Sequence, residues 1–117
     1  MPGVETLGTL LYSEAVSTGR IDLGRFLQLV SSGPAKLFGL AQKGRLEPGA
    51  DGDFVVFDPD AAWTLDESEL HHIAGWSPYH GREVRGRVVS TWLRGDAIFA
   101  DGKITAAPGT GRFVHPD

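Results

Sequence analysis

The apolar residues of the first forty positions recur at intervals of three and four, which is the spacing of one face of a helix. Gly19 is expected to end a first helix, and Asp22 is expected to cap a second. Pro34 is expected to break the second helix and to open a short third one, which Gly39 ends. The two apolar stripes consist of Leu7, Leu10, Leu11 and Ala15, and of Leu23, Phe26, Leu27 and Val30.

From Gly44 onward, turn residues alternate with short apolar runs, and this pattern predicts strands. The apolar run at residues 54–57 favours a strand that is buried on both faces. A turn at Asp58-Pro59-Asp60 is expected to separate it from a second strand at residues 62–65. Residues 71–83 are rich in glycine and proline and predict an irregular loop.

Further strands are expected in the last third of the chain. Residues 84–93 alternate between two faces, as a half-buried strand does. Arg94-Gly95 and Asp101-Gly102 are hairpin turn sequences on either side of a strand at residues 97–100. Residues 103–105 are expected to close the meander.

The order of helices first and strands afterwards is typical of the α+β class. We expect residues 1–41 to form a helical segment and residues 42–117 to form a small, antiparallel-rich β-sheet. Both helices carry wide apolar stripes, and a meander with one free face is too small to cover them fully. Either the helices pack on the sheet, or they belong against something absent from this chain.

The composition of the 117 residues narrows the possible partners. Eleven basic against 15 acidic side chains give a net charge of −4, which leaves no basic surface for nucleic acid or an anionic membrane. The absence of cysteine excludes disulfides and thiolate metal sites. No apolar run is long enough to span a bilayer, and no secretory signal opens the chain. We therefore expect a soluble, cytoplasmic protein.

The residue types that carry chemistry are present but scattered. His71 and His72 are adjacent, so their side chains diverge on a helix or on a strand and do not chelate together. His80 lies in the predicted loop, where it faces solvent or a partner, and His115 belongs to the tail. The acidic pairs occupy turn and cap positions, and neither a nucleophile elbow nor a phosphate loop occurs. We assign no catalytic residue and no metal ligand, and expect no self-contained active site.

Four segments nevertheless resemble, in order and spacing, the C-terminal end of the cyclic amidohydrolases. This branch of the amidohydrolase superfamily contains dihydroorotases, allantoinases and hydantoinases (dihydropyrimidinases). The similar segments are Pro2-Gly3-Val4-Glu5-Thr6, residues 32–40, residues 43–58, and Ser77-Pro78-Tyr79-x-Gly81 with the strand and Arg94-Gly95 that follow.

The resemblance implies a fold and a chemistry for a longer parent enzyme. Residues 3–40 would be the last helices of a (β/α)₈ barrel, and residues 44–105 would be C-terminal strands of a small β-sandwich built from both chain ends. The family hydrolyses a cyclic amide at a binuclear zinc centre, whose ligands lie upstream of Pro2 and match nothing here. Pro2 and Gly3 would present backbone groups to the substrate ring; alternatively, Gly3 only allows a tight turn before the helix.

Two classes of function follow. We favour the C-terminal portion of a metal-dependent cyclic amidohydrolase, inactive as this isolated chain, with a dihydroorotase- or allantoinase-like parent preferred over a hydantoinase. The alternative is a stand-alone, β-rich binding or assembly module without catalysis. An active site shared across a homo-oligomer would require the histidines to converge. The expected partners are the N-terminal part of the enzyme, or further copies that cover the helix faces carrying Leu7, Leu11, Phe26 and Val30.

Overall fold

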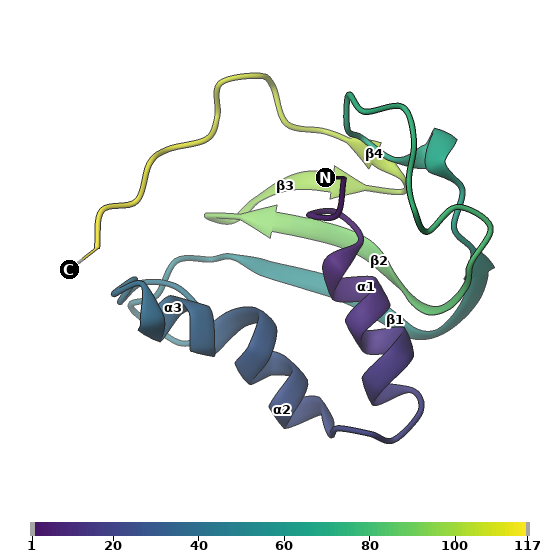
Figure 1. Ribbon diagram of the computed structural model, residues 1–117. Helices are drawn as coiled ribbons and strands as arrows, with labels where there is room; N and C mark the ends of the chain where they lie inside the picture. The colour runs from purple at the N-terminus through teal and green to yellow at the C-terminus, as the bar shows by residue number, and fades with distance from the viewer. Residues whose placement is uncertain (1, 117) are drawn as a thin grey trace.

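The computed structural model describes residues 2–116, in which helices come first and an antiparallel sheet follows (Figure 1). Helix α1 spans Leu7–Leu11 and continues directly into the π-helical segment η1 at Tyr12–Val16. A second continuous run comprises α2 at Leu23–Leu27, the π-helical segment η2 at Gln28–Ser32, and α3 at Gly33–Leu37. The α+β class expected from the sequence is confirmed.

The helix boundaries follow local chemistry. The Asp22 carboxylate accepts a hydrogen bond of 2.7 Å from the backbone N–H of Arg25, which confirms the predicted cap. Gly19 and Gly39 have φ values of +73° and +64°, the left-handed conformation with which glycine ends a helix. The predicted short third helix is found as α3, with Pro34 in its first turn. The predicted break before it is wrong, because η2 widens the helix there and the Gly33 N–H bonds to the carbonyl of Gln28, five residues back. This wider turn accommodates a proline that cannot donate a hydrogen bond.

The four strands found within residues 2–116 form one antiparallel sheet in chain order: β1 at Phe54–Thr64, β2 at Glu83–Leu93, β3 at Asp96–Ala100 and β4 at Lys103–Ile104. Arg94 and Asp101 have positive φ values of +51° and +50°, and each is followed by a glycine that also has positive φ. These are the turn conformations that match the twist of paired strands, so both predicted hairpins are confirmed.

Strand β1 differs from the prediction in two ways. The expected turn at Asp58-Pro59-Asp60 is a bulge within one strand, because Asp58 pairs with Arg87 and the pairing resumes at Ala62. The expected burial on both faces is also wrong, since the side chains of Val55 and Val56 are 53% and 44% exposed. Consecutive residues of a strand point to opposite faces, so at this end of β1 the described residues bury neither face completely.

Helix α1 and segment η1 approach the sheet with a polar face. Thr6, Thr9 and Ser13 follow helical spacing and are buried, and the Ser13 hydroxyl accepts a 3.0 Å hydrogen bond from the backbone N–H of Arg85 in β2. Leu7, on the predicted apolar stripe, is 64% exposed. The short hydroxyl side chains bring the helix close to β2 and turn part of the leucine stripe away from the sheet.

The closest approach occurs at Gly86 in β2, whose φ is +92°. A Cβ atom at this position would lie 2.4 Å from the Phe57 ring and 2.7 Å from the Tyr12 ring. These two rings pack edge to face with centroids 4.8 Å apart, and the indole N–H of Trp63 donates to the Gly86 carbonyl at 3.0 Å. Gly86 is therefore the point where helix and sheet interlock.

The connection between helices and sheet is held by an ionic node. The Lys43 ammonium bonds to Asp51 at 2.7 Å and also to Asp53. The other oxygen of Asp53 accepts a 2.8 Å hydrogen bond from the backbone N–H of Arg94, at the β2–β3 turn. Burial acts to raise the pKa of Asp53, but the hydrogen bonds from Lys43 and Arg94 outweigh it and hold the pKa below its ordinary value. Hydrogen bonds to Asp51 and Asp53 raise the pKa of Lys43.

None of the helices within residues 2–116 combines the length and the apolar character needed to cross a bilayer. The cytoplasmic location expected from the sequence stays a prediction.

The substitution Gly86→Ala tests the interlock. We expect it to lower the free energy of unfolding by about 2–4 kcal/mol, because the new methyl group collides with two rings at a backbone angle that alanine disfavours. Gly49→Ala is the matched control, since Gly49 has the same φ of +92° but open space around it, and we expect a cost of about 1 kcal/mol. Urea unfolding followed by tryptophan fluorescence measures both; equal losses would show that backbone strain alone matters at Gly86.

The ionic node predicts a pH dependence of stability. The pKa of Asp53 is lower in the folded than in the unfolded chain, so its stabilising contribution is present above about pH 4 and is lost as the pH falls through the folded pKa. Asp53→Asn keeps an acceptor for Arg94 but removes the charge, and we expect a loss of about 1–2 kcal/mol at pH 7. Urea titrations of both proteins at pH 7 and at about pH 3 check this. A difference that persists unchanged in acid would contradict the ionic origin.

Candidate functional site

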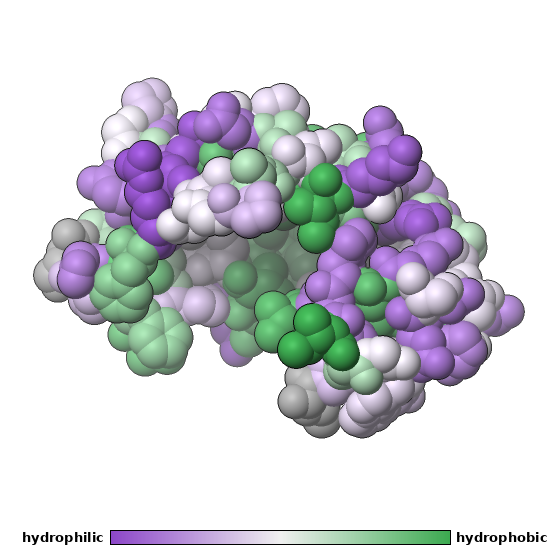
Figure 2. All heavy atoms as spheres, turned by 90° about the horizontal axis from the view of Figure 1, so that it is seen from above, coloured by the Kyte–Doolittle hydropathy of each residue, from purple (hydrophilic) through white to green (hydrophobic). Residues whose placement is uncertain are grey.

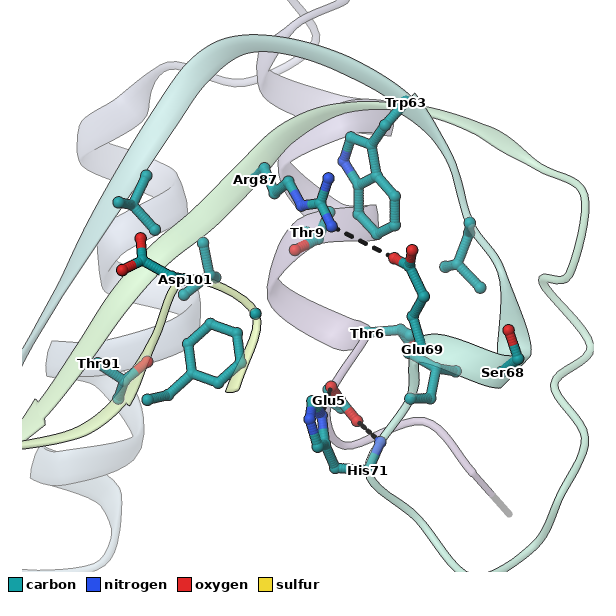
Figure 3. Close-up of a pocket in the computed structure, with 16 residues that line it drawn as sticks. Glu5, Thr6, Thr9, Trp63, Ser68, Glu69, His71, Arg87, Thr91 and Asp101 are labelled. Carbon is teal, nitrogen blue, oxygen red and sulfur yellow. Dashed lines mark hydrogen bonds and ion pairs between the residues drawn. The ribbon is translucent and has the colours of Figure 1, made fainter. Parts of the chain in front are cut away.

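A hollow of about 930 Å³ lies between the start of α1, the segment after β1, and strands β2 and β3 (Figure 3). Thr6 and Thr9 line it from the helix, Trp63 from β1, Arg87 from β2 and Phe99 from β3. Its walls mix hydroxyl, charged and aromatic groups. The segment around η3 (Glu67–Glu69) and the β3–β4 turn complete its lining, with Ser68 to His71 and Asp101-Gly102.

The charged groups on one wall of this hollow are paired with each other. The Arg87 guanidinium lies 4.7 Å from the centre of the Trp63 ring and donates to the Glu69 carboxylate at 3.3 Å. Glu69 ends the short 3₁₀ helix η3, Glu67–Glu69, which Asp66 caps by accepting from the backbone N–H of Ser68. That bond lowers the pKa of Asp66. The arginine therefore fastens η3 to the sheet.

A second pair joins two segments that are 66 residues apart. The Glu5 carboxylate accepts the backbone N–H of His71 with one oxygen and faces the ring Nδ1 of His71 with the other, both at 2.8 Å (Figure 3). A carboxylate opposite Nδ1 requires the hydrogen on that nitrogen. The His71 ring also packs edge to face with Phe99 of β3, with centroids 5.9 Å apart.

A smaller hollow of about 320 Å³ lies behind this pair. It is lined by the residues from Pro2 to Thr6 together with His71 and His72. Both ring nitrogens of His72 are buried there without a hydrogen-bond partner among residues 2–116. A buried imidazole without partners is costly, so this is a place where the described chain leaves polar groups unsatisfied.

The structure places Pro2 and Gly3, the predicted substrate contacts, on this smaller hollow. The Gly3 carbonyl is already engaged, because it accepts the backbone N–H of Leu7 at 3.0 Å and the hydroxyl of Thr6 at 3.3 Å. The Pro2 carbonyl and the Gly3 N–H have no hydrogen-bond partner within residues 2–116. Nothing bound tests the predicted contact, which stays a prediction.

His71 and His72 line the same smaller hollow, whereas His80 and His115 lie elsewhere. His80 accepts the backbone N–H of Glu67 through Nδ1 at 3.2 Å, and His115 packs against Phe113 in the tail. His71 is engaged with Glu5. No group of three His, Asp or Glu side chains that could hold a metal occurs within residues 2–116. These residues do not fit the binuclear centre that the family resemblance implies for a parent enzyme.

The Ser77-Pro78-Tyr79 motif is structural. Ser77 is buried, its backbone N–H donates to the Glu67 carboxylate at 2.8 Å, and its hydroxyl accepts the N–H of Tyr79 at 3.2 Å. The motif closes a turn that pins the loop to η3.

From the sequence alone Glu5 receives no role in a site, and His72 is considered only as one half of a chelating pair with His71. Glu5 stands only in a short segment before a helix, and no local spacing connects it with His71. The one available signal was its place beside Pro2-Gly3, within a segment singled out by resemblance.

The chain matches a family model described as "Amidohydrolase family" over residues 6–99. A D-phenylhydantoinase from Escherichia coli O1:K1 is 48% identical over 116 residues, which are 98% of this chain and 25% of that protein. A solved D-hydantoinase shares 37% identity with a TM-score of 0.92, covering 97% of this chain and 25% of that one. The dihydropyrimidinase from Brevibacillus agri NCHU1002 shares 35% identity with a TM-score of 0.90, over 93% and 24%.

Two facts follow from these similarities. The chain spans about a quarter of the length of the relatives it matches. These relatives are hydantoinases and dihydropyrimidinases, so the preference for a dihydroorotase- or allantoinase-like parent is not supported. That preference rests on Ser77-Pro78-Tyr79-x-Gly81 together with Leu93-Arg94-Gly95, and the contacts found for Ser77, Tyr79 and the Arg94 N–H within residues 2–116 are the structural ones described above.

We expect the purified chain to retain no stoichiometric zinc, because no three potential ligands gather among residues 2–116 and the His71 ring is already paired with Glu5. The measurement is elemental analysis by mass spectrometry after gel filtration, without chelator and with added zinc sulfate. A protein treated with chelator is the control. One or two tightly held zinc ions per chain would contradict the expectation.

Proposed function

Because this chain belongs to the amidohydrolase family, we propose that it is one portion of a cyclic-amide hydrolase of the hydantoinase (dihydropyrimidinase) kind. In this proposal residues 3–40 are the last helices of the catalytic barrel, and residues 44–105 are strands of the accompanying sandwich. The division at residues 41 and 42 marks the boundary between the two. The 48% identity to a D-phenylhydantoinase across nearly the whole chain is the observation that carries the proposal.

The exposed apolar surface supports the view that further protein covers this chain. Leu7 on α1, Leu27 on α2 and Leu37 on α3 are at least half exposed, as is Val55 at the edge of the sheet. Apolar side chains gather in and around an open hollow on the face seen in Figure 2. A monomeric domain rarely leaves so much apolar surface in water, whereas the missing neighbours of a barrel would bury it.

The site residues proposed in this chain are Pro2 and Gly3. The Pro2 carbonyl and the Gly3 N–H, for which residues 2–116 provide no partner, are one acceptor and one donor. A cyclic amide presents the complementary N–H and C=O along its ring edge, so the pair suits that substrate class. The Gly3 carbonyl is committed to α1 and takes no part.

The binuclear zinc centre of the family would supply the hydrolytic water, and in this proposal other portions of the enzyme hold it. The residues described here only orient the ring. A dihydroorotase or allantoinase parent is a subordinate possibility, distinguished by substrate in the assay below.

The second candidate is a stand-alone assembly module without catalysis. One observation supports this candidate: the four strands and the ionic node both lie within residues 42–105. In that case further copies of the chain would cover the exposed helix faces, and analytical ultracentrifugation would show a defined oligomer.

A chimera tests the proposed function. The matching quarter of the E. coli D-phenylhydantoinase is replaced by this chain, and hydrolysis of hydantoin, dihydrouracil, dihydroorotate and allantoin is measured. We expect the chimera to hydrolyse the first two and the isolated chain to hydrolyse none. The relative without its matching quarter is the control. Hydrolysis by the isolated chain, or a folded, zinc-loaded chimera without activity, would refute the proposal.

A further inference from the structure

We propose that Glu5 and His71 form a positioning pair that holds the Pro2-Gly3 segment in place against the sheet. The role in catalysis rests on the proposed function, in which Pro2 and Gly3 contact the substrate. The positioning itself rests only on the contacts between the described residues.

Glu5 and His71 are joined by two hydrogen bonds. One Glu5 oxygen takes the backbone N–H of His71 and the other takes its ring Nδ1–H, each at 2.8 Å. Two parallel hydrogen bonds to one carboxylate fix its orientation as well as its distance. Because the backbone N–H cannot rotate away, the Glu5 side chain is tied to the main chain of the loop and not only to a mobile ring.

The His71 end of the pair is anchored. Its ring packs on Phe99 of β3. The loop that follows is closed at its base by two backbone hydrogen bonds of 2.9 Å, from Leu65 N–H to the Arg82 carbonyl and from Gly81 N–H to the Leu65 carbonyl. Leu65 itself is the most deeply buried large side chain among residues 2–116. The loop is therefore a firm support for the pair.

The Glu5 end transmits this support to Pro2-Gly3. Glu5 lies between Gly3 and α1, in the turn that the Gly3 carbonyl closes through Leu7 and Thr6. Fixing the Glu5 side chain therefore fixes a short, hydrogen-bonded turn rather than a free strand. Figure 3 shows Glu5 and His71 meeting on one side of the hollow, below the first turn of α1.

The chain contains a matched control for this pair. Glu14 in η1 accepts from Arg82 at 2.8 Å, across 68 residues, and its side chain is about as exposed as that of Glu5. It joins the same helical run to the end of the same loop, but far from Pro2 in the sequence. A merely stabilising role predicts similar consequences for the loss of either pair, whereas a positioning role singles out Glu5.

The first experiment uses the 117-residue chain and needs no activity. Backbone order parameters of Gly3 and Val4 and the ring nitrogen shifts of His71 are measured by NMR in the wild type, Glu5→Gln and Glu14→Gln. Glutamine is isosteric but places an NH₂ group against one of the two His71 donors. We expect the Gly3 and Val4 order parameters to fall below about 0.6 only in Glu5→Gln, with loss of the Nδ1–H signature of His71. Unchanged order in Glu5→Gln, or an equal fall in Glu14→Gln, would overturn the proposal.

The second experiment places the same variants in the chimera described above. We expect Glu5→Gln to raise KM about tenfold while kcat changes less than about threefold, and Glu14→Gln to change neither by more than about twofold. The variant His71→Asn keeps a side-chain N–H that can donate to Glu5, so its KM should stay within about threefold of that of the unsubstituted chimera. The variant His71→Ala has no such donor, and its KM should rise beyond that range. Equal KM values for the two glutamate variants would overturn the catalytic role. An inactive parent chimera would refute the proposed function alone, and the NMR result would still decide the positioning.

Discussion

The close approach of α1 and η1 to strand β2 is the constraint on which the rest of this structure depends. Only a glycine at position 86 leaves room for the rings of Tyr12 and Phe57, and only short hydroxyl side chains on the facing helix allow the backbones so near each other. The Ser13 hydroxyl accepts the backbone N–H of Arg85, the residue next to Gly86, so the close approach is also a hydrogen-bonded one. Helix and sheet are joined through polar contacts at short range. Part of the leucine stripe, including Leu7, therefore stays exposed.

The packing of α1 on β2 also determines which residues the segment before α1 contacts. With α1 laid against β2, its first turn comes beside the loop that follows η3, and Glu5 reaches His71. The unpartnered groups of Pro2, Gly3 and His72 are gathered at the same end of the molecule. The proposed substrate contact, the proposed positioning pair and the unsatisfied histidine are therefore one region, and each is produced by the same contact between helix and sheet.

The family motifs act on structure rather than on substrate. Lys43, Asp51 and Asp53 tie the connection to the β2–β3 turn, and Ser77 ties the loop to η3. In this chain the motif side chains hold a backbone arrangement in place. The contacts described for them give no ground for choosing between a hydantoinase, an allantoinase and a dihydroorotase.

The sequence by itself determined the features that depend on neighbouring residues: the cap at Asp22, the helix ends at Gly19 and Gly39, and the hairpins at Arg94 and Asp101. Each is an effect of backbone preference over two to five residues. Only the tertiary structure decided which face of α1 is buried, that β1 is an exposed edge with a bulge at Pro59, and that Glu5 meets His71. The spacing of apolar residues predicts that one face of an element is buried. Which segment buries that face depends on contacts between residues far apart in the sequence, and the local pattern does not encode these contacts.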